Sequence, residues 1–570
     1  MQYKLIGNND TNDVINTILT NRGVSNPKQY VNLTDDCLCN WWELENINDA
    51  IDCFVKHFES EDVIAILVDC DPDGYSSAAM MYQYIKLMNK NYPVHYMIHK
   101  KPKSHGLSDN DFDIPENTKL LIVPDAGTND WVDCNNLIAN GMDIIILDHH
   151  LQDQLGNNAI LVNNQISDKY SNKDFCGAGV TYEFLLALDD YFWQFYANDF
   201  LDLVAFANIS DIMDLRNPAT RYYVNSGLKN IKNEMLLAMI EAQAYSMHNE
   251  INIHNISWYI TPIFNAMIRI GSFEERSLLF KAFIGEYEEF DYQKRDKTIV
   301  KENIYDRAAR LCKNCKSRQD KMRDKLFADL HSQANPEDKV VMVKANDADA
   351  GIVGLSCMKL ADNLQRPVIV VKEVTKDGKT VLGGSCRNFN NSPVESLKEI
   401  ITNTGLFDFC AGHANAAGVQ IVPENFELAR QAFNTMLHDV EYSPSYLCDF
   451  IFDVDELSIQ FIQEVNSAKW IWCTGIQEPK IAVENIRITR EDIHVQGKNF
   501  NSVSFMNNDI KFVKFNMKEN DDLLEWASAW DGKDDDAITI NVVGTVDISE
   551  WQGVYTPQVV ITDHEITIQN

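Results

Sequence analysis

The chain lacks a basic excess. Its 570 residues include 50 lysines and arginines against 84 aspartates and glutamates, which gives a formal net charge of −34. Because nucleic-acid phosphates attract lysine and arginine, this average argues against a nucleic-acid partner. A local exception is Lys294–Lys325, which has twelve basic and five acidic residues. Such a segment is typical either of a solvated helix with i,i+4 ion pairs or of a surface that binds a phosphate backbone.

Long apolar runs and ordered cysteine motifs are also missing. No run approaches the ~20 apolar residues of a membrane-spanning helix. The N-terminal stretch MQYKLIGNNDTND lacks the basic-then-apolar pattern of a signal peptide. The thirteen cysteines include no set of two CxxC motifs, since CKNC at Cys312–Cys315 stands alone. We therefore expect a cytoplasmic protein with reduced thiols and no membrane contact.

Three short apolar runs indicate a parallel β-sheet. DVIAILVD ends at Asp69, KLLIVPD ends at Asp125 and MDIIILDHH ends at His150, with amphipathic helical segments between them. Strands that alternate with helices in this way are typical of a parallel sheet. The carboxyl ends of such strands meet at one edge, where ligands gather. We therefore expect the three acidic clusters to lie close together.

The rest of the chain changes character twice. Helices dominate from about residue 181 to 330, a second α/β pattern follows, and short alternating strands begin near residue 447. An all-β region of this size favours a barrel over a sandwich. We predict a multidomain α/β protein with an N-terminal helical region (1–45), a parallel-sheet domain (46–225), a helical connector (226–330), a smaller α/β domain (331–440) and a C-terminal all-β barrel (441–570).

The stretch ILVDCDPDGYSS places Asp69, Asp71 and Asp73 at alternate positions after the first run. A calcium loop needs aspartates at its positions 1, 3 and 5, glycine at 6 and glutamate at 12. Position 12 here is Met80, which does not coordinate calcium, and a strand stands where the template has a helix. An aspartyl-phosphate site also begins with a strand and a DxD pair, but it needs a lysine and a later acidic pair, and no such pair stands out beside a strand.

A two-metal hydrolase accounts for more of the acidic residues. Asp125 follows the second run, LDHH (Asp148, His149 and His150) follows the third, and Asp211 lies in NISDIMDL. Two divalent ions ~3.5–4 Å apart need a shared carboxylate and open positions for phosphate and water. Oxygen ligands suit magnesium or manganese, and an imidazole ligand favours manganese.

Four motifs in order, DCDPDG, PDAG, LDHH and SDIMDL, resemble those of the DHH phosphoesterase superfamily. Further along, GGSCRNF and AGHANAAGVQI resemble the DHH-associated domain, and VVGTVDISEWQGVYTPQVVITD resembles an oligonucleotide-binding (OB) barrel. Over nearly its whole length the chain resembles the RecJ family of single-strand-specific 5′→3′ DNA exonucleases. The resemblance implies a DHH phosphoesterase domain at 46–225, a DHH-associated substrate-binding domain at 331–440 and a nucleic-acid-binding OB fold at 441–570.

The resemblance also implies ligands for two divalent cations, Mn²⁺ or Mg²⁺, at Asp71, Asp73, Asp125, His149 and Asp211. Asp125 would bridge both ions. His150 would face the scissile phosphate, and Asp69 would be either a weak metal ligand or a support for the ligands, so these two are the catalytic candidates. Asp148 is expected to orient an imidazole rather than to bind an ion.

Candidate substrate-binding residues implied by the resemblance are Ser385, Arg387, Gly412, His413 and Arg221. A hydroxyl, a guanidinium and an imidazole near glycine-rich backbone suit phosphate oxygens. The chain departs from the family at two positions. Leu67 stands where some relatives have a histidine, and Ala411 stands where the family often has a glycine.

Together these features imply a metal-dependent exonuclease that hydrolyses single-stranded DNA from the 5′ end by a two-metal mechanism, in DNA repair or recombination. Two alternatives stay open: a DHH phosphodiesterase for oligoribonucleotides or cyclic dinucleotides, and a non-catalytic DNA-binding scaffold. The expected partner is single-stranded DNA, with a helicase or single-strand-binding protein as a further partner. We expect the protein to be a monomer.

Overall fold

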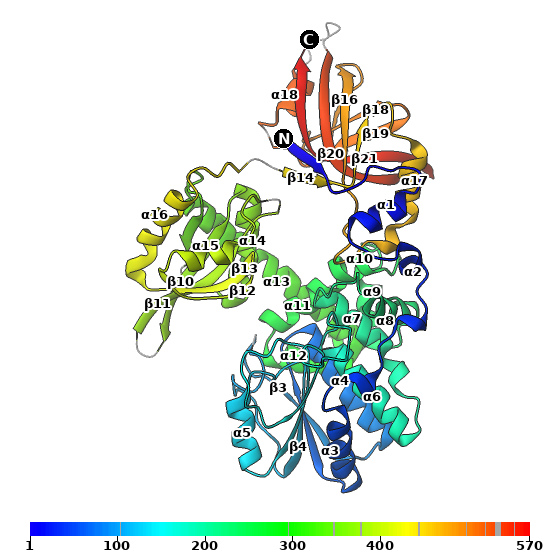
Figure 1. Cartoon of the computed structure of the whole chain (residues 1–570), viewed down its shortest axis with the longest axis vertical. Helices are drawn as coiled ribbons and strands as arrows, with labels where there is room; N and C mark the ends of the chain where they lie inside the picture. Colours follow the sequence, from blue (N-terminus) through cyan, green and yellow to red (C-terminus); the bar gives the residue numbers. More distant parts are fainter. Residues whose placement is uncertain are drawn as a thin grey trace. The chain divides into compact units, whose positions relative to one another are not determined.

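The computed structural model describes residues 1–102, 104–294, 296–345, 348–376, 379–390, 392–442, 445–497, 499–518, 520–529, 537–551 and 553–569. The chain divides into two compact units, whose elements are labelled in Figure 1. The first unit consists of Asn32–Lys321 and Cys473–Gly475. The second consists of Met1–Val31, Met322–Trp472 and Ile476–Asn570.

A five-stranded sheet forms the centre of the first unit. Its strands run in the order β3-β2-β4-β5-β6, where β2 is Val63–Val68, β3 is Val94–Ile98, β4 is Thr118–Pro124, β5 is Asp143–Asp148 and β6 is Ile160–Asn163. All neighbouring strands are parallel, which confirms the predicted parallel sheet. The apolar runs predict β2, β4 and β5. The strands β3 (VHYMI) and β6 (ILVN) are short and partly polar, so they give no comparable signal.

Helices cover both faces of this sheet. On one face, Ile64, Ile66 and Val68 of β2 belong to the same buried cluster as residues of α3 (Ile47–Glu59), α4 (Pro72–Met88) and α6 (Gly177–Phe192). On the other face, Ala65 and Leu67 lie in a cluster with α5 (Trp131–Ala139). Alternate residues of a strand point to opposite faces, so β2 supplies both cores at once. Buried on both sides, it carries no polar residue before its end.

Helix α4 begins directly after β2 because the sequence there is a good helix start. The Asp71 carboxylate accepts a hydrogen bond from the Gly74 N–H at 2.9 Å, and Pro72 stands at the first helical position. A capping carboxylate satisfies an amide that has no partner inside the helix, and proline at this position fixes a helical φ. The cap places Asp71 and Asp73 at the carboxyl edge of the sheet.

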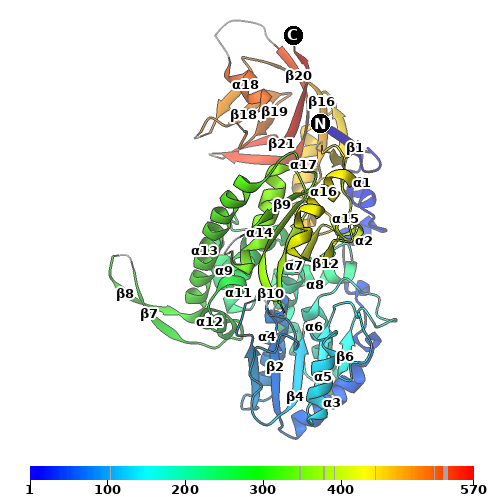
Figure 2. The same ribbon diagram turned by 90° about the vertical axis from the view of Figure 1, so that its left-hand side faces the viewer.

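The helices predicted between residues 181 and 330 are largely present. They are α7 (Leu201–Ser210), α8 (Pro218–Lys229), α9 (Glu234–Gln243), α11 (Thr261–Ile270), α12 (Phe273–Phe283) and α13 (Ile304–Gln333). The prediction is wrong at residues 289–303, where β7 (Glu289–Gln293) and β8 (Ile299–Asn303) form an antiparallel hairpin that extends away from α12 (Figure 2). Strand β7 (EFDYQ) alternates polar and aromatic residues, but β8 (IVKEN) does not alternate, so the sequence gives no clear hairpin signal.

The second unit contains two larger sheets. One has the order β12-β13-β11-β10-β9, with β9 at Val341–Lys344, β10 at Val368–Lys376, β11 at Lys379–Arg387, β12 at Phe407–His413 and β13 at Ala416–Ile421. Together with α14 (Ala350–Leu364), α15 (Leu397–Asn403) and α16 (Phe426–Met436), these strands give the smaller α/β fold that the sequence predicts.

The C-terminal part is a seven-stranded sheet with the order β15-β16-β20-β21-β19-β18-β17. Its strands are β15 (Phe450–Asp453), β16 (Ile481–Thr489), β17 (His494–Gln496), β18 (Ser502–Asn507), β19 (Ile510–Lys514), β20 (Ala537–Trp551) and β21 (Val554–Gln569). Among the described residues the two edge strands, β15 and β17, are not hydrogen-bonded to each other. The all-β texture of the sequence is therefore confirmed, without a closed ring of strands.

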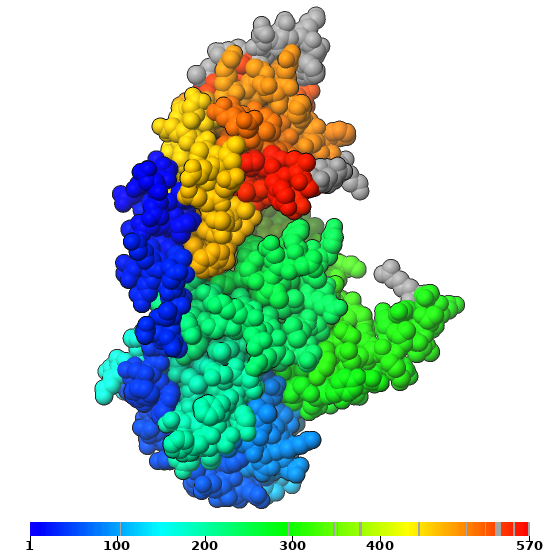
Figure 3. Space-filling view, turned by 90° about the vertical axis from the view of Figure 1, so that its right-hand side faces the viewer, coloured from blue at the N-terminus to red at the C-terminus, as the bar shows by residue number. Residues whose placement is uncertain are grey.

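The N-terminus starts with a strand, which the predicted helical region 1–45 does not include. Strand β1 (Gln2–Leu5) pairs in parallel with β14 (Ser445–Cys448), and Arg22 forms an ion pair with the buried Asp449 at 2.8 Å. Figure 3 shows the first residues, in dark blue, against the yellow and orange C-terminal residues. A strand that pairs about 440 residues away along the chain has no local partner, so the sequence gives no hairpin signal for it.

Among the residues that the structure describes, no helix is long and apolar enough to cross a membrane. All thirteen cysteines are free thiols, and Cys312 and Cys315 are buried in α13 rather than arranged around an ion.

A buried carboxyl group lies inside α6. Glu183 accepts hydrogen bonds from the hydroxyls of Tyr170 and Tyr223 at 3.0 and 3.2 Å. Burial raises the pKa of Glu183 to about 7, although the two hydroxyls act in the opposite direction. The unfolded chain titrates this group near ~4.3. The folded state therefore holds the proton more tightly, and the stability linked to this group is lost as the pH rises from ~4.3 to about 7.

We predict that Glu183→Gln raises the free energy of unfolding at pH 8 by roughly 1–3 kcal/mol and has little effect below pH ~4.5, because the amide stays uncharged. Urea unfolding of wild type and variant, followed by a spectroscopic signal from the first unit, measures this difference at pH 8 and at pH ~4.5. Glu241→Gln, at an exposed position of α9, is the matched control. A difference that is the same at both pH values would contradict the explanation.

Candidate metal centre

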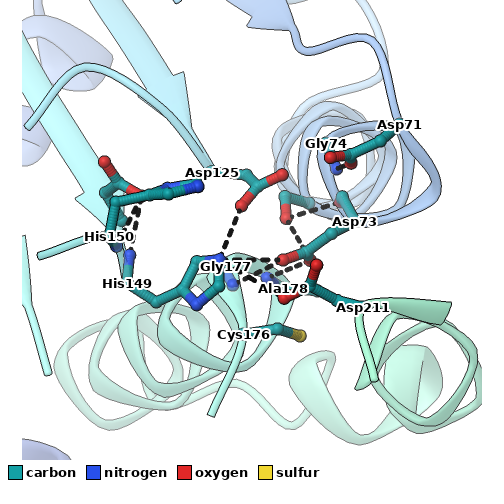
Figure 4. A network of polar contacts seen from close by, with 12 residues as sticks. Asp71, Asp73, Gly74, Asp125, His149, His150, Cys176, Gly177, Ala178 and Asp211 are labelled. Carbon is teal, nitrogen blue, oxygen red and sulfur yellow. Dashed lines mark hydrogen bonds and ion pairs between the residues drawn. The ribbon is translucent and has the colours of Figure 1, made fainter. Parts of the chain in front are cut away.

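Three strands end at the same place. Asp69 to Asp73 follow β2, Asp125 follows β4, and Asp148 ends β5 with His149 and His150 directly after it; these three strands lie side by side in the order β2-β4-β5. Asp211 joins them from the end of α7, where its N–H donates to the Ala207 carbonyl at 2.8 Å. The predicted convergence of the acidic clusters is therefore present in the structure (Figure 4).

Asp125 lies at the middle of the group, 1% exposed. Neither of its carboxylate oxygens has a hydrogen-bond partner among the described residues. Its backbone is left-handed (φ 63°), which is costly for a residue other than glycine and is typical of functional sites. Gly177 allows this placement, since a Cβ there would lie 2.6 Å from the Asp125 Cβ. A buried carboxylate without donors needs a compensating charge.

The His149 imidazole supplies the nitrogen around which three carboxylates gather. Its Nε2 lies 3.3 Å from Asp125 Oδ1, 3.6 Å from Asp211 Oδ2 and 3.8 Å from Asp73 Oδ2. Figure 4 shows Asp125 between this imidazole and the aspartates of α4. One nitrogen and three oxygens around a common space form a donor set that suits a divalent cation.

Two backbone amides at the start of α6 hold Asp73 in place. The N–H groups of Gly177 and Ala178 donate to its two oxygens at 2.7 Å each, and the Ser77 hydroxyl donates at 3.3 Å. The N-terminus of a helix carries partial positive charge, so it stabilises this carboxylate. Oδ2 accepts only the Gly177 N–H among these donors, so it still has a lone pair for another contact.

Asp69 differs from Asp71 and Asp125 because donors occupy both of its oxygens. Oδ2 accepts from His105 Nδ1 at 2.8 Å, and Oδ1 accepts from the Gly106 N–H at 2.9 Å. A ligand oxygen of Asp69 lies within 4.8 Å of ligand oxygens of Asp71 and Asp125. The geometry therefore favours Asp69 as a support for the loop at residue 105, although it stays at the edge of the metal site.

Asp148 orients His150 rather than His149. Its Oδ1 accepts from His150 Nδ1 at 2.7 Å, and Oδ2 accepts from the Thr128 hydroxyl at 2.6 Å. Burial alone would lower the pKa of His150, but the hydrogen bond and charge of Asp148 outweigh it and raise that pKa to about 9. Asp148 reaches His149 only through the His149 backbone N–H, at 2.7 Å. The metal-ligand candidate therefore lacks the expected carboxylate partner on its ring.

At the centre of the site, burial shifts each pKa in the direction that disfavours the charged form of the group. Burial raises the pKa of Asp125 well above its usual range, and the nearby Asp73 adds to the shift. Burial raises the pKa of Asp211 to about 8, with Asp73 again contributing. Burial also lowers the pKa of His149. A divalent cation reverses the preference of the two carboxyl groups, because it favours ionised carboxylates, and it agrees with that of His149, because it binds the neutral imidazole.

The residues present therefore fit divalent cations. Ligand atoms of Asp73, His149 and Asp211 lie within 4.8 Å of one another, and those of Asp69, Asp71 and Asp125 form a second such group. Asp125, 3.3 Å from His149, links the two groups. Two groups of donors with a shared carboxylate are the arrangement that a two-cation centre requires.

Four of the predicted substrate-binding residues gather at one end of the β12-β13-β11 sheet in the second unit. Arg387 and His413 both pair with Ala416, from opposite sides, so their side chains share one face of the sheet. Ser385 lies two residues before Arg387 on that face, and Gly412 precedes His413 with a φ of 132°. The small Ala416 leaves space between the guanidinium and the imidazole, which is suited to a phosphate.

The structure does not bring Arg221 together with the other predicted substrate-binding residues. The side chain is fully buried in α8 of the first unit and donates to Cys473 Sγ at 3.3 Å. The sequence motif shows an arginine near the fourth acidic cluster, but it does not show on which face of the helix the residue lies.

The basic segment Lys294–Lys325 is largely occupied by intramolecular contacts. Arg310 pairs with Glu302 at 2.7 Å, Lys316 with Asp320 at 2.6 Å and Arg318 with Glu275 at 2.7 Å. Within the described part of this segment, the contacts favour the ion-paired helix over a bare phosphate-binding surface.

Sequence reasoning missed two contributors to the site. His105 stands in KSHGLS, where the glycine turn attracts notice and the histidine does not. The amides of Gly177 and Ala178 belong to the backbone, which no side-chain motif reveals; the available signal is the stretch FCGAG before an apolar helix.

Three family models match the chain. The DHH family N-terminal domain matches residues 63–207, the DHHA1 domain matches residues 337–439, and the RecJ OB domain matches residues 448–563. The first match contains all of the acidic clusters except Asp211, and the second contains Ser385, Arg387 and His413.

Curated proteins resemble the chain over its whole length. The putative SPbeta prophage-derived single-strand DNA-specific exonuclease YorK of Bacillus subtilis (strain 168) is 34% identical over 575 residues, which is 99% of this chain and 98% of that protein. The single-stranded-DNA-specific exonuclease RecJ of the same organism is 23% identical over 577 residues, 97% of this chain and 68% of that protein.

Solved structures resemble the fold. The crystal structure of RecJ in complex with Mn²⁺ from Thermus thermophilus has a TM-score of 0.75 and 16% identity, covering 99% of this chain and 79% of that chain. The corresponding Mg²⁺ complex has a TM-score of 0.70 and 17% identity, covering 99% and 78%.

We predict that Asp125→Asn stabilises the protein without divalent cations and destabilises it, relative to the wild type, when Mn²⁺ is present. The amide removes a buried carboxylate that lacks donors, whose cost is ~1–3 kcal/mol. It also removes a ligand, so the stabilisation of ~2.7 kcal/mol that the wild type gains at a hundredfold excess over Kd is lost.

Thermal unfolding with chelator and with Mn²⁺ measures both effects. Asp190→Asn, at an exposed position of α6, is the control. If Asp125→Asn were less stable than the wild type in chelator, the claim that Asp125 lacks a compensating partner would fail.

Proposed function

The chain belongs to the RecJ-like exonucleases of the DHH family, and on that premise we propose that it hydrolyses the phosphodiester bonds of single-stranded DNA from the 5′ end. The observation that carries the proposal is the buried Asp125, whose oxygens lack hydrogen-bond donors while His149, Asp73 and Asp211 surround the same space. A chain that only bound DNA would gain nothing from this costly arrangement.

The metal centre would hold two divalent cations, Mn²⁺ or Mg²⁺. Asp73, His149 and Asp211 would hold one, Asp71 would hold the other, and Asp125 would contact both. When bound, such ions lower the pKa of water and neutralise charge on a phosphate. The backbone amides of α6 keep Asp73 oriented for this role.

His150 would act on the phosphate. Its Nδ1 is held by Asp148 at 2.7 Å, so Nε2 is the nitrogen left for a substrate. The side chain is 44% exposed, which leaves that nitrogen accessible from solvent. A donor aimed at a phosphate oxygen stabilises the negative charge that develops during hydrolysis.

The second unit would bind the strand. Arg387 and His413, on either side of Ala416, would contact a phosphate together with Ser385 and the backbone at Gly412. The C-terminal sheet matches the RecJ OB domain, and OB folds bind single strands by base stacking and by contacts with the backbone. This pair of accessory domains favours a long strand over a dinucleotide.

We further propose that the protein works as a monomer in the cytoplasm, in DNA repair or recombination. A helicase or a single-strand-binding protein would present the strand. With a net charge of −34, DNA binding would rely on a local strip of basic groups, so we expect it to weaken as salt is added.

We predict that a single strand of about 30 nucleotides releases a 5′ label first, as a mononucleotide, when Mn²⁺ is present, and that a 3′ label appears in a ladder of shrinking strands. Gel analysis of the two labelled strands measures the direction. A blunt duplex of the same sequence and the Asp125→Asn variant should give no release.

Other outcomes identify the competing functions. Faster hydrolysis of a dinucleotide than of the strand would indicate an oligoribonucleotide or cyclic-dinucleotide phosphodiesterase. Binding of the strand without any hydrolysis, at saturating Mn²⁺ or Mg²⁺, would indicate a scaffold. Release of the 3′ label first would contradict the proposed direction.

A further inference from the structure

A histidine outside the four motifs lies at the edge of the metal centre. His105 places its Nδ1 2.8 Å from Oδ2 of Asp69, a carboxylate that is itself 2% exposed. A carboxylate only accepts hydrogen bonds, so Nδ1 carries a proton. Burial lowers the pKa of His105, but the hydrogen bond and charge of Asp69 outweigh it and raise that pKa to about 9, so Nε2 carries a proton as well and both nitrogens are donors. The other nitrogen, Nε2, has no partner among the described residues, and the side chain is 52% exposed. The imidazole is thus fixed at one end and open at the other.

The loop that carries His105 is held on both sides. Before it, Asp111 accepts hydrogen bonds from His99 Nδ1 at 2.6 Å and from the Lys101 N–H at 2.7 Å. The buried Arg276 donates to the carbonyls of His99 and Lys100 at 2.8 and 2.6 Å. These contacts pre-organise the backbone, which is what a residue needs if it is to meet a substrate at a defined place.

After His105 the chain is held just as closely. The Gly106 N–H donates to Asp69 Oδ1 at 2.9 Å, and the Leu107 N–H donates to Asp130 Oδ2 at 2.7 Å. Gly106 is left-handed (φ 61°), and a Cβ there would lie 2.2 Å from the Asp130 carboxylate. Only glycine fits this turn, so the turn and the position of His105 depend on each other.

His105 and His150 repeat the same arrangement at the ends of two strands, β2 and β5, which β4 separates in the sheet. In each case a buried aspartate, Asp69 after β2 or Asp148 at the end of β5, accepts from Nδ1 and leaves Nε2 outward. The two imidazole rings lie 5.2 Å apart between centroids, at 65° to each other. Two donors at this separation can meet two oxygens of one phosphate group, as a bidentate contact does.

We propose that His105 is a second phosphate-binding imidazole of the active site, donating from Nε2 to a non-bridging oxygen of the scissile phosphate alongside His150. This inference rests on the proposed function, because it assigns a contact to the same reaction. It also gives Asp69 a defined role, since Asp69 is then a positioning residue for His105, as Asp148 is for His150.

The competing explanation is that His105 acts only through Asp69. In that case the imidazole would keep Asp69 oriented beside Asp71 and Asp125, and its Nε2 would be irrelevant. The two explanations require different nitrogens. The proposal needs Nε2, whereas the competing explanation needs only Nδ1.

A matched pair of substitutions separates the two nitrogens. The amide nitrogen of asparagine occupies the place of Nδ1, and that of glutamine occupies the place of Nε2. His105→Asn therefore keeps the hydrogen bond to Asp69 and loses the outward donor. His105→Gln loses the bond to Asp69 and keeps a donor near the position of Nε2.

We predict that His105→Asn lowers kcat/KM on single-stranded DNA by roughly 100- to 1,000-fold, the usual effect of removing one donor to a developing charge. The Mn²⁺ affinity measured by calorimetry should be unchanged, because Asp69 keeps its partner. His105→Gln should retain more activity than His105→Asn. The opposite order, or a loss of Mn²⁺ affinity in His105→Asn, would overturn the proposal.

Phosphorothioate strands provide a second readout that a structural role would not change. Sulfur at one non-bridging position of the terminal linkage weakens a hydrogen bond made there. With Mn²⁺ as the ion, one of the two diastereomers should show a smaller loss between wild type and His105→Asn than the all-oxygen strand shows. An identical loss for both diastereomers and for the all-oxygen strand would exclude a direct contact.

The wild-type control keeps this test separate from the proposed function. If wild-type protein with Mn²⁺ does not hydrolyse the all-oxygen strand, the proposed function itself fails. If wild-type protein hydrolyses the strand and His105→Asn hydrolyses it equally well, only the inference about His105 fails.

Discussion

Repulsion among carboxylates at the carboxyl edge of the parallel sheet is the constraint on which the rest of the first unit depends. Asp125, Asp73 and Asp211 converge on His149 Nε2 at 3.3 to 3.8 Å. Like charges this close are tolerated when a cation or a pre-arranged set of dipoles compensates them. The start of α6, the cap of α4 and the left-handed backbone of Asp125 all serve to hold these groups where they repel each other most.

The supports of the site also divide the carboxylates into two classes. Asp125 has oxygens without donors, whereas both oxygens of Asp69 and of Asp148 accept hydrogen bonds. Asp69 and Asp148 each anchor an imidazole, whereas the backbone amides that hold Asp73 leave its Oδ2 3.8 Å from His149 Nε2, in the cation-binding group. The same edge of the sheet thus combines cation-binding groups with hydrogen-bond donors for a phosphate.

The sequence predicts the residues of the metal centre better than the elements and contacts around them, for physical reasons. Continuous apolar runs ending in acids, as at Asp69 and Asp125, are visible because buried parallel strands need them. The strand β1 is invisible because its partner lies at the far end of the chain. The burial of Arg221 and the orientation of His105 depend on tertiary packing, which residue spacing does not encode. The partner of Asp148 is predicted in kind, an imidazole, but its identity as His150 depends on side-chain geometry.

The central claim is that one buried carboxylate, Asp125, joins two cation sites. Electron paramagnetic resonance of the wild-type protein, titrated with Mn²⁺ in the absence of DNA, tests it most directly. The account predicts that two Mn²⁺ bind per chain and give the broadened spectrum of exchange-coupled ions, because a shared carboxylate holds them ~3.5–4 Å apart. A spectrum of isolated Mn²⁺ at saturation, or binding of a single ion, would contradict it.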